Sequence, residues 1–169
     1  MQPPVLPAAT LARLLRLARL DGTGVLAIAG AFAIGHAAMG ERGGALIGLL
    51  VAGAGAVELH GASLLGRGNP RGLRWLVGSQ LYLLAAILGY VALRLVSYDP
   101  ALINLVLTDG MRQHYLDAGL HPEEMDLIVK WSYYLTYVIV GMLTVVYQGL
   151  MLRFYLRHWA DVQEALDGN

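Results

Sequence analysis

The chain has no cysteine among its 169 residues, and this absence removes several kinds of chemistry. Without a thiol it can have no disulfide, no cysteine nucleophile, no thiolate metal ligand and no palmitoyl anchor. Charge is scarce too, since only 14% of the residues are Asp, Glu, Lys or Arg. The formal net charge is zero, so the composition predicts no nucleic-acid partner.

Hydrophobic residues make up 57% of the chain, and its mean hydropathy is +0.56, which is typical of membrane proteins. A transmembrane helix needs about 20 mostly apolar residues. Four stretches meet this requirement, over residues 22–39, 44–65, 73–96 and 127–152. Because these stretches occupy most of the sequence, we predict a single membrane domain over residues 1–169.

The connections between the spans predict an antiparallel bundle with a defined orientation. The turn at residues 41–43 is short enough to force a hairpin, and residues 66–72 combine glycine, Asn-Pro and arginine. Most basic residues then gather on one side of the membrane: Arg13, Arg16, Arg19, Arg67, Arg71, Arg74, Arg153 and Arg157. Basic loops stay in the cytoplasm. The fold class predicted is an all-α integral membrane protein, a four-transmembrane-helix antiparallel bundle with both termini cytoplasmic, in a bacterial inner (plasma) membrane.

Three flanking segments have patterns of their own. Residues 10–20 place arginines on one face and leucines on the other, which predicts an amphipathic helix on the inner leaflet. Residues 97–126 form an outer loop with helix-start signals, so we expect short helices there. In residues 153–169 the apolar pattern persists to Leu166, which predicts a cytoplasmic extension of the fourth helix.

The N-terminal part also resembles a signal peptide, because a basic region precedes an apolar one that ends in Gly35-His36-Ala37. Removal of the first span would leave an odd number of spans and put the two basic loops on opposite sides. We therefore expect the first span to be retained.

Glu58 is the most informative residue, because a carboxylate at membrane depth is a functional hypothesis by default. At about 1.5 Å per residue, Glu58 lies roughly 10 Å from the inner boundary, and polar residues of the third and fourth spans reach a similar depth. This predicts an intramembrane polar site: Glu58, His60, Ser79, Gln80, Thr144, Tyr147 and Gln148. The layer could be a proton relay, a cation site or a polar head-group pocket. Alternatively, it could only tie the spans together by hydrogen bonds.

The histidines do not form a metal or haem site by spacing. His36 lies near the outer end of its span and His60 near the inner end of the next, so they do not face one iron. The other three histidines lie in the flanks at unrelated spacings. We predict no metal and no cofactor.

Three arginines near the second loop, Arg67, Arg71 and Arg74, could contact an anionic lipid head group. The alternative is that they serve orientation alone. Membrane lipid is therefore a predicted partner.

Small and aromatic residues also follow patterns along the spans. Rows of small residues predict close helix approach, either inside the first hairpin or between protomers. These rows are Ala27, Ala31 and Gly35, then Gly48 and Ala52, then Ala62 and Gly66. Aromatic residues predict interfacial belts at the two ends of the last span. They are Tyr133, Tyr134 and Tyr137 at the outer end and Phe154, Tyr155 and Trp159 at the inner end.

No short catalytic or nucleotide-binding motif occurs, so we predict that the protein is not an enzyme. The first hypothesis is a homo-oligomeric channel-like or transport protein with a polar layer around Glu58. The second is a non-enzymatic membrane scaffold or accessory subunit that binds a membrane partner. A lipid- or quinone-directed membrane enzyme is third, because no nucleophile and base are paired in the loops.

Overall fold

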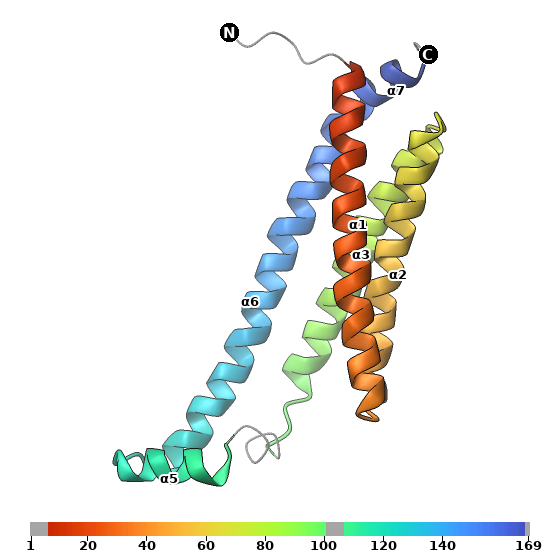
Figure 1. Ribbon diagram of the computed structural model, residues 1–169. Coiled ribbons are helices and arrows are strands. Elements are labelled where there is room, and N and C mark those ends of the chain that lie inside the picture. The colour runs from red at the N-terminus through yellow and green to blue at the C-terminus, as the bar shows by residue number, and fades with distance from the viewer. Residues whose placement is uncertain (1–6, 101–106, 168–169) are drawn as a thin grey trace, which may run out of the picture. The chain divides into compact units, whose positions relative to one another are not determined.

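The computed structural model of the protein describes residues 7–100 and 107–167, and within these residues it is helical, with no strand (Figure 1). The helices are α1 (Pro7–Ala38), α2 (Arg42–Gly66), α3 (Arg71–Val96), α5 (Asp109–Asp117), α6 (Pro122–Arg157) and α7 (Trp159–Asp167). Residues 101–106 of the expected outer loop and residues 168–169 of the expected tail lie outside the described residues.

Four of these helices, α1, α2, α3 and α6, are long and apolar enough to cross a membrane. This confirms the prediction of four helices able to span a membrane, although α1 and α6 extend beyond residues 22–39 and 127–152. Many of their large apolar side chains point outward, as Ile28 of α1, Leu49 of α2 and Leu143 of α6 illustrate. Such exposure is unfavourable in water but not against lipid tails, which are as apolar as leucine. These features indicate a membrane protein.

The chain forms two compact units: residues 1–87 with 144–169, and residues 88–143. Helices α3 and α6 contribute to both. The first unit has a core where the start of α1, the end of α2, the start of α3, the end of α6 and α7 meet. Its buried residues are Leu14, Ala18, Ala62, Leu65, Leu73, Leu76, Tyr155 and Val162.

The expectation of a separate surface helix over residues 10–20 is wrong. These residues continue without a break into the first span as α1. Leu14 and Ala18 on their apolar face are 0% exposed, because they pack into the core of the first unit, while Arg13 and Arg16 on the other face stay exposed. No proline separates the segment from the span, so backbone hydrogen bonding carries the helix onward.

The expected straight extension of the fourth helix is also not observed. Helix α6 ends at Arg157, and α7 follows after His158 and packs against α1. Val162 is 1% exposed there, and Leu166 packs against the same core. The apolar pattern beyond Arg157 therefore serves contacts within the protein.

Small residues set the spacing of the helices in the first unit. A Cβ added to Gly48 would lie 2.8 Å from Ala33, and one added to Gly55 would lie 2.7 Å from the Gly22 carbonyl oxygen. Helices α1 and α2 thus approach each other closely along the hairpin. At Gly61 a Cβ would lie 2.9 Å from a carbonyl oxygen of α3, so α2 and α3 are equally close.

In the second unit, tyrosine side chains make several of the contacts. The Tyr133 hydroxyl donates a hydrogen bond to the Arg94 carbonyl oxygen at 2.9 Å. The Tyr133 ring lies 4.8 Å from that of Tyr137 and 5.2 Å from that of Tyr98, between ring centroids. Helix α6 begins here at Pro122, and the Glu124 carboxylate accepts a hydrogen bond from the His121 backbone N–H at 2.8 Å, which caps the helix start.

Candidate functional site

Glu58 of α2 lies in the first unit with its side chain enclosed, at 1% exposure. Its Oε1 atom accepts two hydrogen bonds, one from Gln80 Nε2 at 2.9 Å and one from the Tyr155 hydroxyl at 2.7 Å. Helices α2, α3 and α6 therefore all contribute to the surroundings of this carboxylate.

A second carboxylate, Asp21 of α1, belongs to the same network. Gln80 Nε2 donates to Asp21 Oδ2 at 3.2 Å, and the Tyr147 hydroxyl donates to Asp21 Oδ1 at 2.7 Å. Each carboxylate thus receives one hydrogen bond from the shared amide and one from a tyrosine. Because both oxygens contact the same nitrogen, at 2.9 and 3.2 Å, they lie at most 6.1 Å apart.

Glycines next to the carboxylates hold the helices at this spacing. Glu58 stands three residues from Gly55, which meets α1, and three residues from Gly61, which meets α3. Asp21 directly precedes Gly22, the residue that Gly55 contacts. The close approaches therefore bring the carboxylates of α1 and α2 to one level and within reach of Gln80.

The network is rich in hydrogen-bond acceptors. The Gln80 amino group faces the two carboxylates, so its carbonyl oxygen points elsewhere, and this buried oxygen has no partner among the described residues. The buried Oε1 of Gln148 also has none there. An unsatisfied buried acceptor destabilises a protein by about 1 to 3 kcal/mol. Nor does any basic side chain of residues 7–100 and 107–167 form an ion pair with Asp21 or Glu58.

The structure brings together some of the residues predicted for the polar site and separates others. Gln80 hydrogen-bonds to Glu58 directly, and Tyr147 is connected to Gln80 through Asp21. Gln148, the next residue after Tyr147, is buried.

Ser79 is buried, but its hydroxyl donates to the Leu76 carbonyl oxygen of its own helix at 2.8 Å. His60 is exposed, and its ring meets that of Trp75 edge to face at 5.4 Å between centroids. Thr144 is half-buried on α6, one turn before Gln148. Among the described residues, neither Ser79 nor His60 hydrogen-bonds to either carboxylate.

Sequence reasoning missed Asp21 and Tyr155. Asp21 lies just outside the first predicted span, which begins at residue 22, and the hairpin places it opposite Glu58. Glu58 follows the Gly40 turn by 18 residues, and Asp21 precedes it by 19. Tyr155 was assigned to an interfacial belt, yet it is 0% exposed and hydrogen-bonded to Glu58. Its spacing of seven residues from Gln148, which puts both on one helix face, was the available signal.

The arginines predicted to contact anionic lipid, Arg67, Arg71 and Arg74, are all exposed. Arg67 and Arg19 line a hollow of about 440 Å³ together with Thr23 and Ser63. Two basic side chains beside hydroxyl groups would suit a phosphate. Lipid contact at this place stays a prediction.

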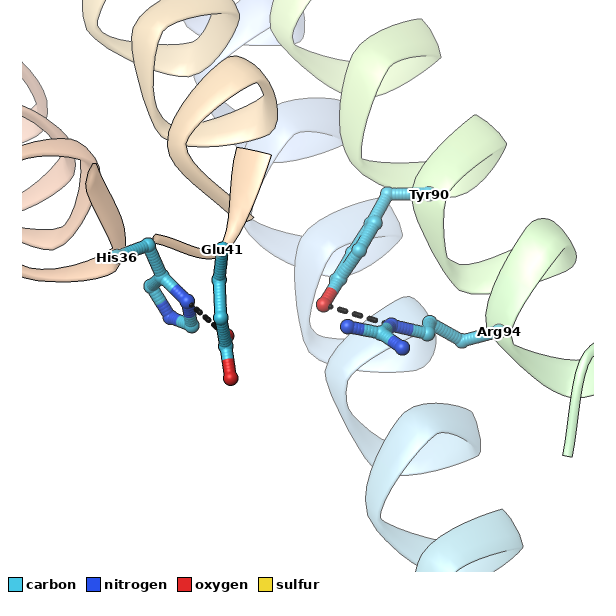
Figure 2. A network of polar contacts seen from close by, with 4 residues as sticks. All are labelled: His36, Glu41, Tyr90 and Arg94. Carbon is cyan, nitrogen blue, oxygen red and sulfur yellow. Dashed lines mark hydrogen bonds and ion pairs between the residues drawn. The ribbon is translucent and has the colours of Figure 1, made fainter. Parts of the chain in front are cut away.

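At the turn between α1 and α2, His36 Nδ1 pairs with a Glu41 carboxylate oxygen at 2.6 Å (Figure 2). This contact gives His36 a local role in the hairpin turn. In the described part of the chain, no three histidine or acidic side chains are placed to hold a metal ion.

Comparison of the chain with protein-family models, with curated proteins and with solved structures finds no match. Function must therefore be argued from the site alone.

Proposed function

We propose that the protein is a membrane transport protein in which Asp21 and Glu58 bind and release protons. The observation that supports this is the carboxylate pair itself, held by a shared amide inside a unit made of membrane-spanning helices. Two negative charges at most 6.1 Å apart repel each other strongly where the dielectric constant is low. A proton on the pair removes this repulsion.

The pair has an accessible and an enclosed member. Asp21 is only half-buried and its partner Tyr147 is 49% exposed, whereas Glu58 is 1% exposed and its partner Tyr155 is 0% exposed. A proton would enter at Asp21 and pass to Glu58. The buried carbonyl oxygens of Gln80 and Gln148, which have no partner among the described residues, would accept hydrogen bonds from water.

A monovalent cation is the other species that this chemistry suits. Carboxylate, amide and hydroxyl oxygens are hard ligands, and such oxygens bind metal cations directly. Sodium or potassium would therefore compete with the proton for the same pair.

We further propose an inner-membrane orientation with both termini in the cytoplasm, and assembly of several copies. The arginine distribution supports the orientation. The exposed row of Ala27, Ala31 and Gly35 on α1 supports assembly, because a Cβ at Gly35 would meet nothing within 4 Å.

The test is proton flux in proteoliposomes that contain purified wild-type protein or a variant. We expect Glu58→Gln to reduce flux at least tenfold, because the amide cannot carry the proton. Asp21→Asn should reduce it to a similar degree. The matched control is His60→Gln, an exposed titratable residue two positions from Glu58, which should leave flux unchanged.

Oligomeric mass is measured on the same samples, so that loss of flux is not confused with loss of assembly. Equal flux in wild type and Glu58→Gln would contradict the proposal. Sodium or potassium flux in place of proton flux would assign the pair to a cation.

A second candidate function is a membrane scaffold, which the exposed small-residue row on α1 also favours. It predicts no flux from any variant. It also predicts that replacing Ala31 by Leu abolishes the binding of a defined membrane partner. The oligomeric mass of the purified protein would stay the same.

A further inference from the structure

The second unit contains a cavity of about 550 Å³, within the range of roughly 300 to 1,000 Å³ that is usual for ligand sites. The end of α3, α5 and the first half of α6 contribute to its wall. Most of the wall is apolar or aromatic, and Leu107 and Met125, at 6% and 4% exposure, are its most enclosed members. Met111 and Ile128 also line it but are exposed, so the cavity opens to the outside.

Among the described residues that line the cavity, Arg94 is the one with a charge. Its Nε–H donates to the Tyr90 hydroxyl at 3.0 Å, and the guanidinium carbon lies 5.3 Å from the centre of the Tyr90 ring (Figure 2). Tyr90 thus holds the side chain in place by a hydrogen bond and a cation–π contact. No carboxylate in the described ranges forms an ion pair with Arg94. The positive charge of Arg94 is therefore available to pair with an anion from outside the protein.

A second donor lines the same cavity. The Tyr98 hydroxyl is buried and has no hydrogen-bond partner among the described residues. Desolvation raises the pKa of Tyr98 above its usual value, with a smaller contribution from the negative charge of Asp126. The hydroxyl therefore keeps its proton and remains a donor. The cavity thus offers the Arg94 guanidinium and the Tyr98 hydroxyl as donors in a largely apolar and aromatic wall, which suits a ligand with oxygen acceptors at one end.

We propose that this cavity binds one anionic phospholipid, with an acyl chain among the apolar residues and its phosphate on Arg94. Arginine recognises phosphate through paired N–H donors, and the guanidinium here retains two nitrogens that Tyr90 does not occupy. The methionines Met111 and Met125 suit a flexible chain, because their side chains adapt to irregular shapes. Helices α3 and α6 are membrane spans, so phospholipid surrounds the cavity at high local concentration.

The experiment is native mass spectrometry of the purified full chain in detergent, titrated with palmitoyl-oleoyl phosphatidylglycerol or with the matched phosphatidylcholine. We expect the anionic lipid to bind at least about tenfold more tightly to the wild type, as charge-assisted hydrogen bonds imply. Arg94→Gln should remove this preference, and Arg94→Lys should keep part of it. The matched control is Lys130→Gln, which removes an exposed positive charge from α6 outside the cavity wall and should keep the preference.

A second variant tests whether the acyl chain lies in the cavity, and it leaves every buried residue unchanged. Ser132 lines the cavity but is exposed, so Ser132→Trp should fill the space and weaken both lipids severalfold without unfolding the helix. Circular dichroism confirms the fold of each variant. Equal binding of the two lipids to the wild type, an equal loss in Arg94→Gln and Lys130→Gln, or unchanged binding in Ser132→Trp would overturn the proposal. Displacement of the phospholipid by an equal concentration of free oleate would also overturn it, because the occupant would then be a fatty acid.

Discussion

The helices of the two compact units pack through different kinds of residue, and the polar groups of the two units differ as well. In the first unit, glycines such as Gly55 and Gly61 bring backbones into contact, and Glu58 is enclosed there with its partners Gln80 and Tyr155.

In the second unit, a Cβ at Gly89 or Gly110 would meet nothing within 4 Å, and one at Gly141 would reach only side chains, at 3.5 Å or more. Tyrosines connect α3 and α6 there, through the Tyr90 and Tyr137 rings and the Tyr133 hydroxyl. A cavity of about 550 Å³ remains there. Small residues at the helix contacts of the first unit thus accompany a close-packed site rich in acceptors. Large residues in the second unit accompany an open cavity with donors.

The largest expected effect comes from breaking the close approach in the first unit. Gly55→Val would push atoms into Gly22 and Leu26, and overpacking of this kind destabilises proteins by about 1 to 3 kcal/mol or more. We expect a value at the upper end, because backbone atoms cannot move aside as side chains do. The free energy of unfolding is measured by titration with sodium dodecyl sulfate in mixed micelles. Gly53→Val on the same helix is the control, because a Cβ at Gly53 meets nothing within 4 Å. An equal loss of unfolding free energy in both variants would contradict the role of the close approach.

A smaller effect is expected from Tyr155→Phe, which removes the hydroxyl that donates to Glu58 but keeps the buried ring. Hydrogen bonds of this kind within membrane proteins contribute about 0.6 to 2 kcal/mol, and the complete burial of Tyr155 favours the upper part of that range. The same unfolding titration measures the loss. The double variant with Glu58→Gln should lose less than the sum of the two single variants, and strict additivity would show that the two side chains do not interact.

The smallest effect should come from the matching change in the second unit, Tyr133→Phe. Its hydroxyl donates to the Arg94 carbonyl oxygen, but Tyr133 is only half-buried beside an open cavity. Water can replace the lost donor, so we expect about 0.5 kcal/mol or less. A loss as large as that of Tyr155→Phe would mean that the second unit is as tightly enclosed as the first.

Much of the fold could be predicted because it depends on local properties of the sequence. Apolar stretches long enough to span a membrane follow from composition alone, and Gly40 and Gly68, both at positive φ, provide turns between successive spans. Depth counting also placed Gln80 near Glu58, and they are hydrogen-bonded. The same counting failed for His60, because depth does not specify which face of a helix a residue occupies.

The errors at residues 10–20 and at Tyr155 have one cause. An amphipathic or aromatic segment near a span end fits the membrane interface and fits a protein core equally well, since both offer an apolar side and a polar side. The start of α1 and the end of α6 are covered by α7, which makes these segments core. No local sequence pattern indicates that α7 packs against α1.

The sequence by itself determined the membrane class, the four spans and the isolation of Glu58 among apolar residues, because hydrophobicity and length act along the chain. Only the tertiary structure decided that Asp21, Gln80 and Tyr155 would join Glu58, and that Arg94 would stand in a cavity with no carboxylate partner among the described residues. Those outcomes depend on how each helix is rotated and how closely it meets the next. Rotation and distance are set by contacts between residues far apart in the chain.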